Sequence, residues 1–269
     1  MKKPRLLGKV FTVLIMFFLY APIFVLIVFS FNSTKSRTIW SGFTLDWYAE
    51  LFQNRTVIDS LYTTIEVSVL SSLIATVLGT FFAIGLYSLR RKWRQPILTV
   101  SNIPVINADI ITGVSLSLLF VSAGAILGVS KGMGTLLLAH LTFNIPYVVL
   151  SVMPKLHQLD QNLFEAARDL GCSWIQAMFK VIIPQIRPGI VNGMLIAFTM
   201  SVDDFVISYF TAGSEVQTLS MTIYAMTRKR VSPEINAIST LLFVVVLLLL
   251  IVINVRSSRQ EKKHELLEQ

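Results

Sequence analysis

The segment Ile235–Val255 reads INAISTLLFVVVLLLLIVINV, and its central run Leu241–Ile253 contains no polar residue. A membrane-spanning helix needs about 20 mostly apolar residues, because each residue rises about 1.5 Å through a hydrocarbon core about 30 Å thick. This segment carries no charge and is long enough to cross that core. It therefore predicts an integral membrane protein built of helices.

The composition of the whole chain agrees with this prediction. Of its 269 residues, 54% are hydrophobic and only 14% are charged, whereas a soluble domain carries about 25% charged residues. Cys172 is the only cysteine, which excludes an intrachain disulfide framework. The three histidines, His140, His157 and His264, are too widely spaced to form a metal-binding motif. The sequence thus excludes a soluble metalloenzyme and a disulfide-stapled secreted domain.

Six apolar segments are candidates for membrane spans, so we predict an all-α protein with six transmembrane helices. The third segment is hard to delimit, because the stretch Ile97–Val129 is too long for one straight crossing and contains Pro104, Asn107 and Asp109. The predicted spans cover about residues 10–31, 67–89, 105–129, 133–153, 190–210 and 235–255.

The basic residues predict the orientation of these spans. Sixteen of the 23 lysines and arginines fall at the two termini or in the second-to-third and fourth-to-fifth connections. Cytoplasmic segments are enriched in lysine and arginine, so this side is predicted to be cytoplasmic and both termini lie inside. Residues 32–66 and 211–234 then form external loops. The net charge of +8 is explained by orientation and needs no nucleic-acid partner.

The cytoplasmic connection 154–188 has the pattern of two short helices. Asp160 is placed to cap the first helix, and Gly171 stands where a left-handed residue would end it. Ser173 and Gln176 have the spacing of a capping box that starts the second helix. Pro184 and Pro188 are expected to end it. A capped helix pair at the membrane surface is suited to docking into a groove of another protein.

This connection resembles the EAA loop of permease subunits of binding-protein-dependent (type I) ABC importers. The similarity rests on Glu165-Ala166-Ala167, on Gly171, and on Val181-Ile182-Ile183-Pro184, which replaces the usual I-x-L-P. The resemblance implies that this coupling-helix pair between helices 4 and 5 contacts an ATPase subunit. The residues implied in that contact are Glu165, Ala166, Ala167, Gly171 and Pro184. A generic surface helix pair is the alternative.

Shorter strings are similar to the polyamine-type permeases, in particular to spermidine/putrescine permeases of the second (C) type. They are Ser30-Phe31-Asn32-Ser33, Phe43-Thr44-x-x-Trp47-Tyr48, Ala108-Asp109-Ile110, Met200-Ser201-Val202-Asp203-Asp204 and Val231-Ser232-Pro233-Glu234-Ile235-Asn236-Ala237. The resemblance implies half of a pathway for spermidine or putrescine across the bacterial cytoplasmic membrane. Other small solutes, such as an amino-acid derivative, thiamine or iron, stay open as cargo. An ion-coupled secondary carrier is a further alternative.

Three acidic residues lie in the predicted spans and call for an explanation. A carboxylate at the centre of a membrane helix costs roughly 2.5–3.5 kcal/mol on insertion scales. A polyamine is a chain of ammonium groups, and carboxylates along its path would stabilise it, so we predict that Asp109, Asp203 and Asp204 line the substrate pathway. Neighbouring helical residues point about 100° apart, so only one of Asp203 and Asp204 is expected to face the pathway. The alternatives are an N-cap for Asp109 and a hydrogen-bonded network for the pair.

Three other polar positions are candidates of lower weight. His140 is expected to be a hydrogen-bonded packing residue rather than a proton relay. Tyr224 and Glu234, in the predicted external loop, are candidates for contact with the substrate or a binding protein, and a solvated loop is the alternative.

The sequence contains no GxxxxGK[ST] phosphate-binding motif and no recognisable catalytic triad. We therefore expect no enzymatic activity, no metal site and no cofactor on this chain, with ATP and Mg²⁺ bound by partners. The resemblance implies a second homologous permease subunit, two ATPase subunits and an extracytoplasmic substrate-binding protein.

Overall fold

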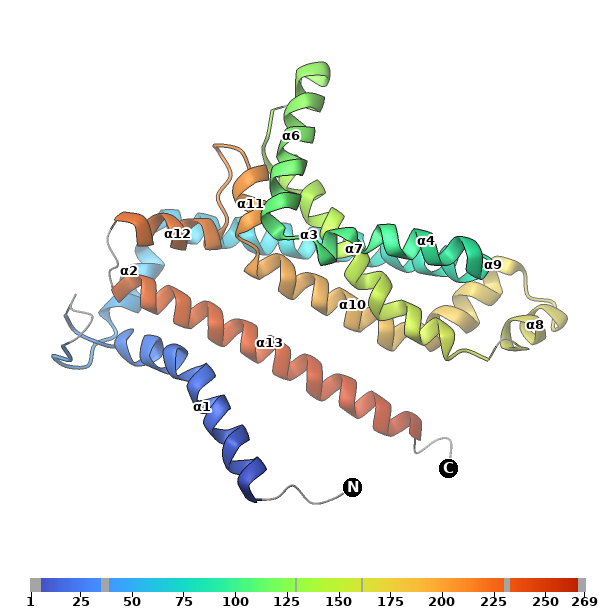
Figure 1. Ribbon diagram of the computed structural model, residues 1–269, viewed down its shortest axis with the longest axis horizontal. Helices are drawn as coiled ribbons and strands as arrows, with labels where there is room; N and C mark the ends of the chain where they lie inside the picture. The colour runs from blue at the N-terminus through green and yellow to red at the C-terminus, as the bar shows by residue number, and fades with distance from the viewer. Residues whose placement is uncertain (1–5, 35–38, 129, 161, 230–232, 266–269) are drawn as a thin grey trace. The chain divides into compact units, whose positions relative to one another are not determined.

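A computed structural model describes residues 6–34, 39–128, 130–160, 162–229 and 233–265 (Figure 1). These residues are almost entirely helical, and within them strand-like pairing is limited to one bridge between Asn32 and Phe43. The helices are α1 Leu6–Phe29, α2 Asp46–Gln53, α3 Arg55–Ser88, α4 Arg91–Ser101, α5 Ile103–Ile106, α6 Asp109–Leu127, α7 Met133–His157, α8 Asn162–Asp169, α9 Trp174–Ala177, the π-helical turn η1 Met178–Ile182, α10 Ile183–Asp203, α11 Val206–Thr211, α12 Leu219–Lys229 and α13 Pro233–Glu265.

Five described helical segments are long and apolar enough to cross a membrane, and Pro233–Leu248 of α13 is a shorter apolar segment. Together they correspond in order to the six predicted spans, which confirms the all-α membrane fold. The five segments are Gly8–Phe29, Arg55–Ser88, Asp109–Leu127, Met133–His157 and Trp174–Asp203.

The helix boundaries differ from the predicted spans in three places. Helix α3 begins at Arg55, well before residue 67, so part of the predicted external loop is helical. The third span begins only at Asp109, because α5 ends at Ile106 and Asn107 is extended. The predicted external loop 211–234 contains α12, and Glu234 already belongs to the first turn of α13.

The chain divides into two compact units, and each is described by itself. Unit 1 comprises residues 1–59 and 222–248, and unit 2 comprises residues 60–221 and 249–269. In unit 1, Asn32 holds the turn after α1, because its side chain accepts from Ser41 N–H at 3.0 Å and donates to the carbonyl of Ile39 at 2.8 Å. The indole of Trp47, on α2, donates to the Asn32 carbonyl at 2.8 Å.

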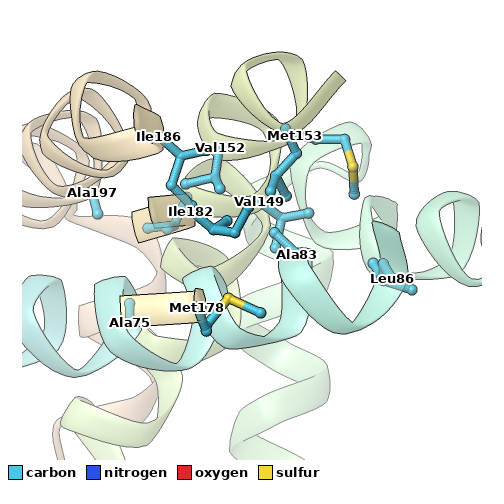
Figure 2. Packing of buried hydrophobic residues seen from close by; sticks show 12 residues of the cluster. Ala75, Ala83, Leu86, Val149, Val152, Met153, Met178, Ile182, Ile186 and Ala197 are labelled. Atoms are coloured by element: carbon cyan, nitrogen blue, oxygen red, sulfur yellow. The ribbon is translucent and has the colours of Figure 1, made fainter. Parts of the chain in front are cut away.

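The main core of unit 2 lies where α3, α7, η1 and α10 pack together (Figure 2). Each helix contributes fully or nearly fully buried aliphatic side chains. The cluster consists of Ala75, Ala83, Leu86, Val148, Val149, Val152, Met153, Leu156, Met178, Ile182, Ile186 and Ala197.

Two glycines allow α7 and α10 to approach each other closely. A Cβ built on Gly193 would lie 3.0 Å from the Cα of Val148 and 3.2 Å from the Cβ of Ser151. A Cβ on Gly189 would lie 2.9 Å from the carbonyl oxygen of Ser151. Small residues at such crossings let helix backbones pack tightly in a membrane, where dispersion contacts and hydrogen bonds replace the hydrophobic effect.

Helix α3 carries a stripe of hydroxyl side chains that repeats every four residues. All six members of the stripe are buried, and they are Ser60, Thr64, Ser68, Ser72, Thr76 and Thr80. Residues four apart lie close to one face of a helix. At 3.6 residues per turn the stripe winds slowly around α3 and follows the surface that is buried by protein. Thr64 and Thr76 bond back to the carbonyls four residues earlier, at 2.9 and 2.6 Å. Small hydroxyl residues of this kind are typical of helix contacts in membranes.

We predict that Gly193→Ala destabilises the protein by roughly 1–3 kcal/mol, because overpacking a tight helix contact forces the backbones apart. Gly85→Ala is the matched control, since a Cβ on Gly85 meets nothing within 4 Å. Thermal unfolding of both variants in detergent measures the difference. Equal melting temperatures for the two variants would contradict the packing described for α7 and α10.

Candidate functional site

The three acidic residues singled out in the sequence line one pocket of about 220 Å³ in unit 2. Asp109 comes from the start of α6, Asp203 from the end of α10, and Asp204 from the break that follows. The remaining lining residues are Pro104, Phe143, Tyr147, Met200, Phe205, Val206 and Ile207. We refer to this site as the acid pocket. The structure thus brings together acids that lie almost 100 residues apart in the chain.

The position of Asp204 follows from a break in the fifth span. The predicted span 190–210 is not one helix, since α10 ends at Asp203 and α11 begins at Val206. Asp204 is extended, and its carboxylate accepts hydrogen bonds from Ile207 N–H at 3.2 Å and from Ser208 N–H at 2.7 Å. A carboxylate at a helix start satisfies amide groups that have no partner within the helix. Asp204 therefore caps α11, and this explains the acid at that position.

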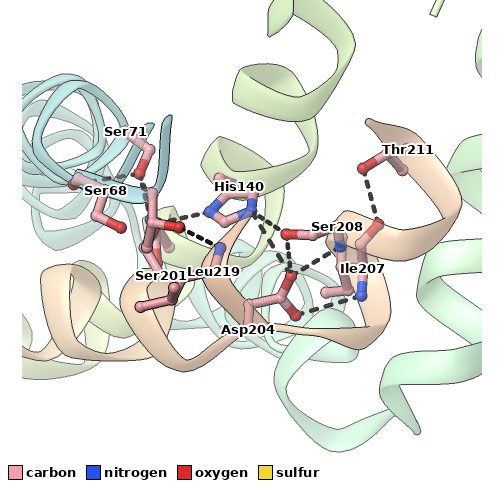
Figure 3. Close-up of polar contacts among 11 residues, drawn as sticks. Ser68, Ser71, His140, Ser201, Asp204, Ile207, Ser208, Thr211 and Leu219 are labelled. Carbon is pink, nitrogen blue, oxygen red and sulfur yellow. Dashed lines mark hydrogen bonds and ion pairs between the residues drawn. The ribbon is translucent and has the colours of Figure 1, made fainter. Parts of the chain in front are cut away.

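A buried polar network starts at Asp204 and joins the four helices α11, α7, α10 and α3 (Figure 3). The hydroxyl of Ser208 donates to the Asp204 carboxylate at 2.7 Å, and His140 Nε2 lies 3.0 Å from the same hydroxyl. On the other side of the ring, His140 Nδ1 lies 2.5 Å from the Ser201 hydroxyl. Ser201 in turn lies 3.1 Å from the hydroxyl of Ser71, on α3. The prediction that His140 is a hydrogen-bonded packing residue is confirmed.

Asp203 differs from its neighbour. Its side chain is exposed at the acid pocket, whereas that of Asp204 is only 9% exposed. Asp204 is therefore the acid that pairs within the protein. That Asp203 faces a substrate pathway stays a prediction. Asp109 is also exposed, and it is the first residue of α6. The alternative prediction made Asp109 the N-cap of this helix. In the structure the N-cap of α6 is Ala108, and Asp109 is the next residue.

Aromatic rings complete the acid pocket, and no sequence pattern distinguishes them from the other apolar residues of these helices. Phe143 and Tyr147, both on α7, lie four residues apart and so share a face, and Phe205 follows the break. Carboxylates attract ammonium groups, and aromatic faces attract cations and pack against methylene chains. The pocket is therefore chemically suited to an organic cation.

The second candidate site is the helix pair in the connection 154–188. Asp160 accepts from Asn162 N–H at 3.0 Å and so caps α8, as predicted. Gly171 has φ +85°, and the α8 end is closed by bonds from Gly171 N–H to the Arg168 carbonyl and from Cys172 N–H to the Ala167 carbonyl. This is the glycine-terminated Schellman arrangement.

The second helix of the pair begins as predicted but does not end as predicted. Ser173 accepts from Gln176 N–H at 3.3 Å, and the Gln176 side chain accepts from Ser173 N–H at 3.0 Å, which is the capping box. The expectation that Pro184 and Pro188 end this helix is wrong. The π-helical turn η1 comes directly before Pro184, the second residue of α10, and a local π-helical widening of this kind accommodates a proline within a continuing helix. The helix therefore continues from Trp174 to Asp203.

The residues of the EAA string divide between the surface and the interior. Glu165, Ala166 and Pro184 are exposed, and Gly171 lies at the exposed turn between α8 and α9. Ala167 is buried, so less of its side chain is open to a partner than that of Ala166. Large apolar side chains are exposed around the same turn, and they are Leu170, Trp174, Ile175 and Phe179.

Tyr224 and Glu234 lie in unit 1, and their contact with the substrate or a binding protein stays a prediction. Tyr224 is on α12, and the guanidinium carbon of Arg228 lies 5.2 Å from its ring centroid.

Among the described residues, no group of three or more His, Cys, Asp or Glu side chains could hold a metal ion.

Solved structures with a similar fold come from ABC transporters. A bacterial ABC transporter involved in the import of the acidic polysaccharide alginate matches with a TM-score of 0.69 and 19% identity, over 94% of this chain and 95% of the other. The MetNI methionine ABC transporter matches with a TM-score of 0.62 and 20% identity, over 76% of this chain and 95% of the other. At these identities the likeness establishes the fold.

Relatives found by sequence share a higher identity with this chain than these solved structures do. The spermidine/putrescine transport system permease protein PotC of Haemophilus influenzae is 35% identical over 239 residues, covering 89% of this chain and 91% of the relative. The putrescine transport system permease protein PotI of Escherichia coli is 37% identical over 228 residues, covering 84% and 81%. Residues 75–262 match the family described as binding-protein-dependent transport system inner membrane component. The chain belongs to this family of inner-membrane transport subunits.

Proposed function

We propose that the chain is the permease subunit of an ATP-driven importer and forms half of a translocation pathway for polyamines such as spermidine and putrescine. The observation that carries this proposal is the acid pocket, where Asp109, Asp203 and Asp204 meet the aromatic rings of Phe143 and Tyr147. The names of the PotC and PotI relatives support the same cargo.

The charges of the pocket favour a cationic cargo over an anionic or neutral one. A carboxylate about 4 Å from an ammonium group gains about 4 kcal/mol of Coulomb energy at an effective dielectric constant of 20, before desolvation is subtracted. Asp204 is already engaged by two N–H groups and a hydroxyl. Asp203 and Asp109 are the exposed acids and are proposed to meet the ammonium groups in turn.

The partners proposed for this subunit follow from the same family. They are a second homologous permease, two ATPase subunits that bind ATP and Mg²⁺, and an extracytoplasmic binding protein that delivers the cargo. On the predicted cytoplasmic side, the exposed surface of α8 and α9 around Glu165, Leu170 and Ile175 offers a charged and apolar patch for an ATPase cleft. Movement of the ATPase subunits would be transmitted through this pair, so that the pathway opens alternately to the two sides.

We predict that Asp203→Asn lowers uptake of labelled spermidine into proteoliposomes that hold the assembled transporter by on the order of 10-fold, a loss of about 1.4 kcal/mol. The substitution keeps the shape of the side chain and removes its charge. Glu50→Gln is the matched control, because Glu50 is an exposed acid on α2.

Competition by unlabelled solutes in the same assay tests the cargo itself. Putrescine and spermidine are expected to compete, whereas thiamine, ferric iron and neutral amino acids are not. Uptake blocked by one of these other solutes and insensitive to polyamines would contradict the proposed cargo. Uptake that persists without ATP and collapses with the proton gradient would instead favour a secondary carrier.

We predict that Glu165→Lys uncouples the ATPase subunits from the permease, because it places a cation where the exposed carboxylate of α8 would meet a partner. Copurification of the ATPase with the tagged variant should fall at least 10-fold, while the variant still inserts into the membrane. Glu215→Lys makes the same charge change at an exposed residue on the opposite predicted side. Unchanged copurification with Glu165→Lys would remove α8 from the proposed contact.

A further inference from the structure

A second cavity, of about 610 Å³, lies in unit 2 away from the acid pocket. It is enclosed by the end of α3, the start of α4, the end of α7 and the helix pair α8 and α9 with η1. Ligand-binding cavities have volumes of roughly 300–1,000 Å³. Much of its wall is apolar, formed by residues such as Phe81, Ile84, Leu156, Phe164 and Ile182.

One cationic side chain that lines the cavity has a hydrogen-bond donor without a partner among the described residues. This side chain is Arg94, and the donor is its buried Nε. A buried donor without a partner is destabilising, and an anionic acceptor would relieve it. Asp160 also lines the cavity, but its Oδ1 accepts from Asn162 N–H at 3.0 Å, in its role as the cap of α8. His157 packs edge-on against Tyr87, with 5.4 Å between ring centroids.

The predicted topology puts Arg94 near the cytoplasmic surface of the membrane. Arg90, Arg91, Lys92 and Arg94 follow directly after the apolar helix α3, on the predicted cytoplasmic side. Trp93, between them, is 61% exposed, and tryptophan is enriched where a membrane meets water. Clusters of basic residues next to a span attract anionic lipids, and basic pockets between membrane helices bind their headgroups.

We propose that this cavity binds one anionic phospholipid. Its phosphate would accept a hydrogen bond from Arg94, and an acyl chain would lie along the apolar wall at Phe81, Ile84 and Leu156. Phe164 of α8 and Trp174 of α9 line the same cavity, so a bound lipid would also contact the helix pair. The bound lipid therefore supports the orientation of α8 and α9. The lipid site itself does not depend on the proposed cargo; only its consequence for ATPase coupling rests on the proposed function.

Native mass spectrometry of the full chain, purified in detergent and titrated with phosphatidylglycerol, tests the site directly. The wild-type chain is expected to bind phosphatidylglycerol more tightly than zwitterionic phosphatidylethanolamine. Arg94→Gln should weaken phosphatidylglycerol binding by about 10-fold, the order expected when one charge-assisted hydrogen bond is lost. Arg91→Gln removes the same charge from an exposed residue of α4 that does not line the cavity, and should change binding less than twofold.

A second variant tests the cavity without changing charge. Gly85 lines it, and a Cβ at this position meets nothing within 4 Å, so Gly85→Phe should fill the space and abolish binding, whereas Gly85→Ala should not. Equal effects of Arg94→Gln and Arg91→Gln, or unchanged binding by Gly85→Phe, would overturn the site in favour of diffuse surface attraction. Competition by glycerol 3-phosphate as strong as that by the lipid would assign the site to a soluble phosphate compound and would also overturn the proposal. Because binding is measured without transport, failure here leaves the proposed cargo unaffected.

Discussion

The carboxylate of Asp204 holds the break in the fifth span, and the acid pocket depends on this break. Hydrocarbon offers no hydrogen bonds, so a helix can be interrupted within a membrane only where protein groups satisfy the freed amides. Asp204 does this for Ile207 and Ser208, while the Ser208 hydroxyl, which also contacts His140, donates to the carboxylate in turn. With Asp204 fixed at the start of α11, the preceding residue, Asp203, is exposed at the pocket. One acid thus positions the backbone, and its neighbour remains free for a ligand.

A continuous stretch of helix joins the acid pocket to the helix pair. From Trp174 the chain runs through α9, the π-helical turn and α10 to Asp203 without interruption. The close contact of α10 with α7 at Gly189 and Gly193 supports this stretch along its length. In the proposed importer, a displacement of α9 by an ATPase would therefore be carried as a rigid movement to the acids at the other end. The π-helical turn, which accommodates Pro184, lies near the start of this path.

The features that the sequence predicted well are local ones. Caps and turns depend on residues within one helical turn of each other, so Asp160, Gly171, Ser173 and Gln176 could be assigned from spacing alone. The gathering of Asp109, Asp203 and Asp204 was predicted only as a shared chemical role, because their proximity depends on how α6, α7 and α10 pack. The helix break was not predicted, since an aspartate within an apolar run carries no mark of whether it caps a helix or faces a pathway.

Other differences have equally physical causes. A proline at position 184 predicts the end of a helix. The helix continues instead, because the wider π-helical turn before Pro184 accommodates the proline. Ala167 is buried by its own chain, and the partner contact implied for it stays a prediction. The hydroxyl stripe on α3, from Ser60 to Thr80, repeats every four residues in the sequence. Such a repeat of small polar residues within an apolar helix is typical of a helix surface that packs on protein.

The central claim is that a polyamine passes through the acid pocket. Photo-crosslinking of a spermidine analogue to the reconstituted transporter, followed by peptide mapping during ATP turnover, addresses it most directly. Labelling is expected to concentrate on the pocket walls at Tyr147, Met200 and Phe205, and excess unlabelled spermidine is expected to remove it. Labelling confined to other segments of this chain, with the pocket peptides unmodified, would contradict the account.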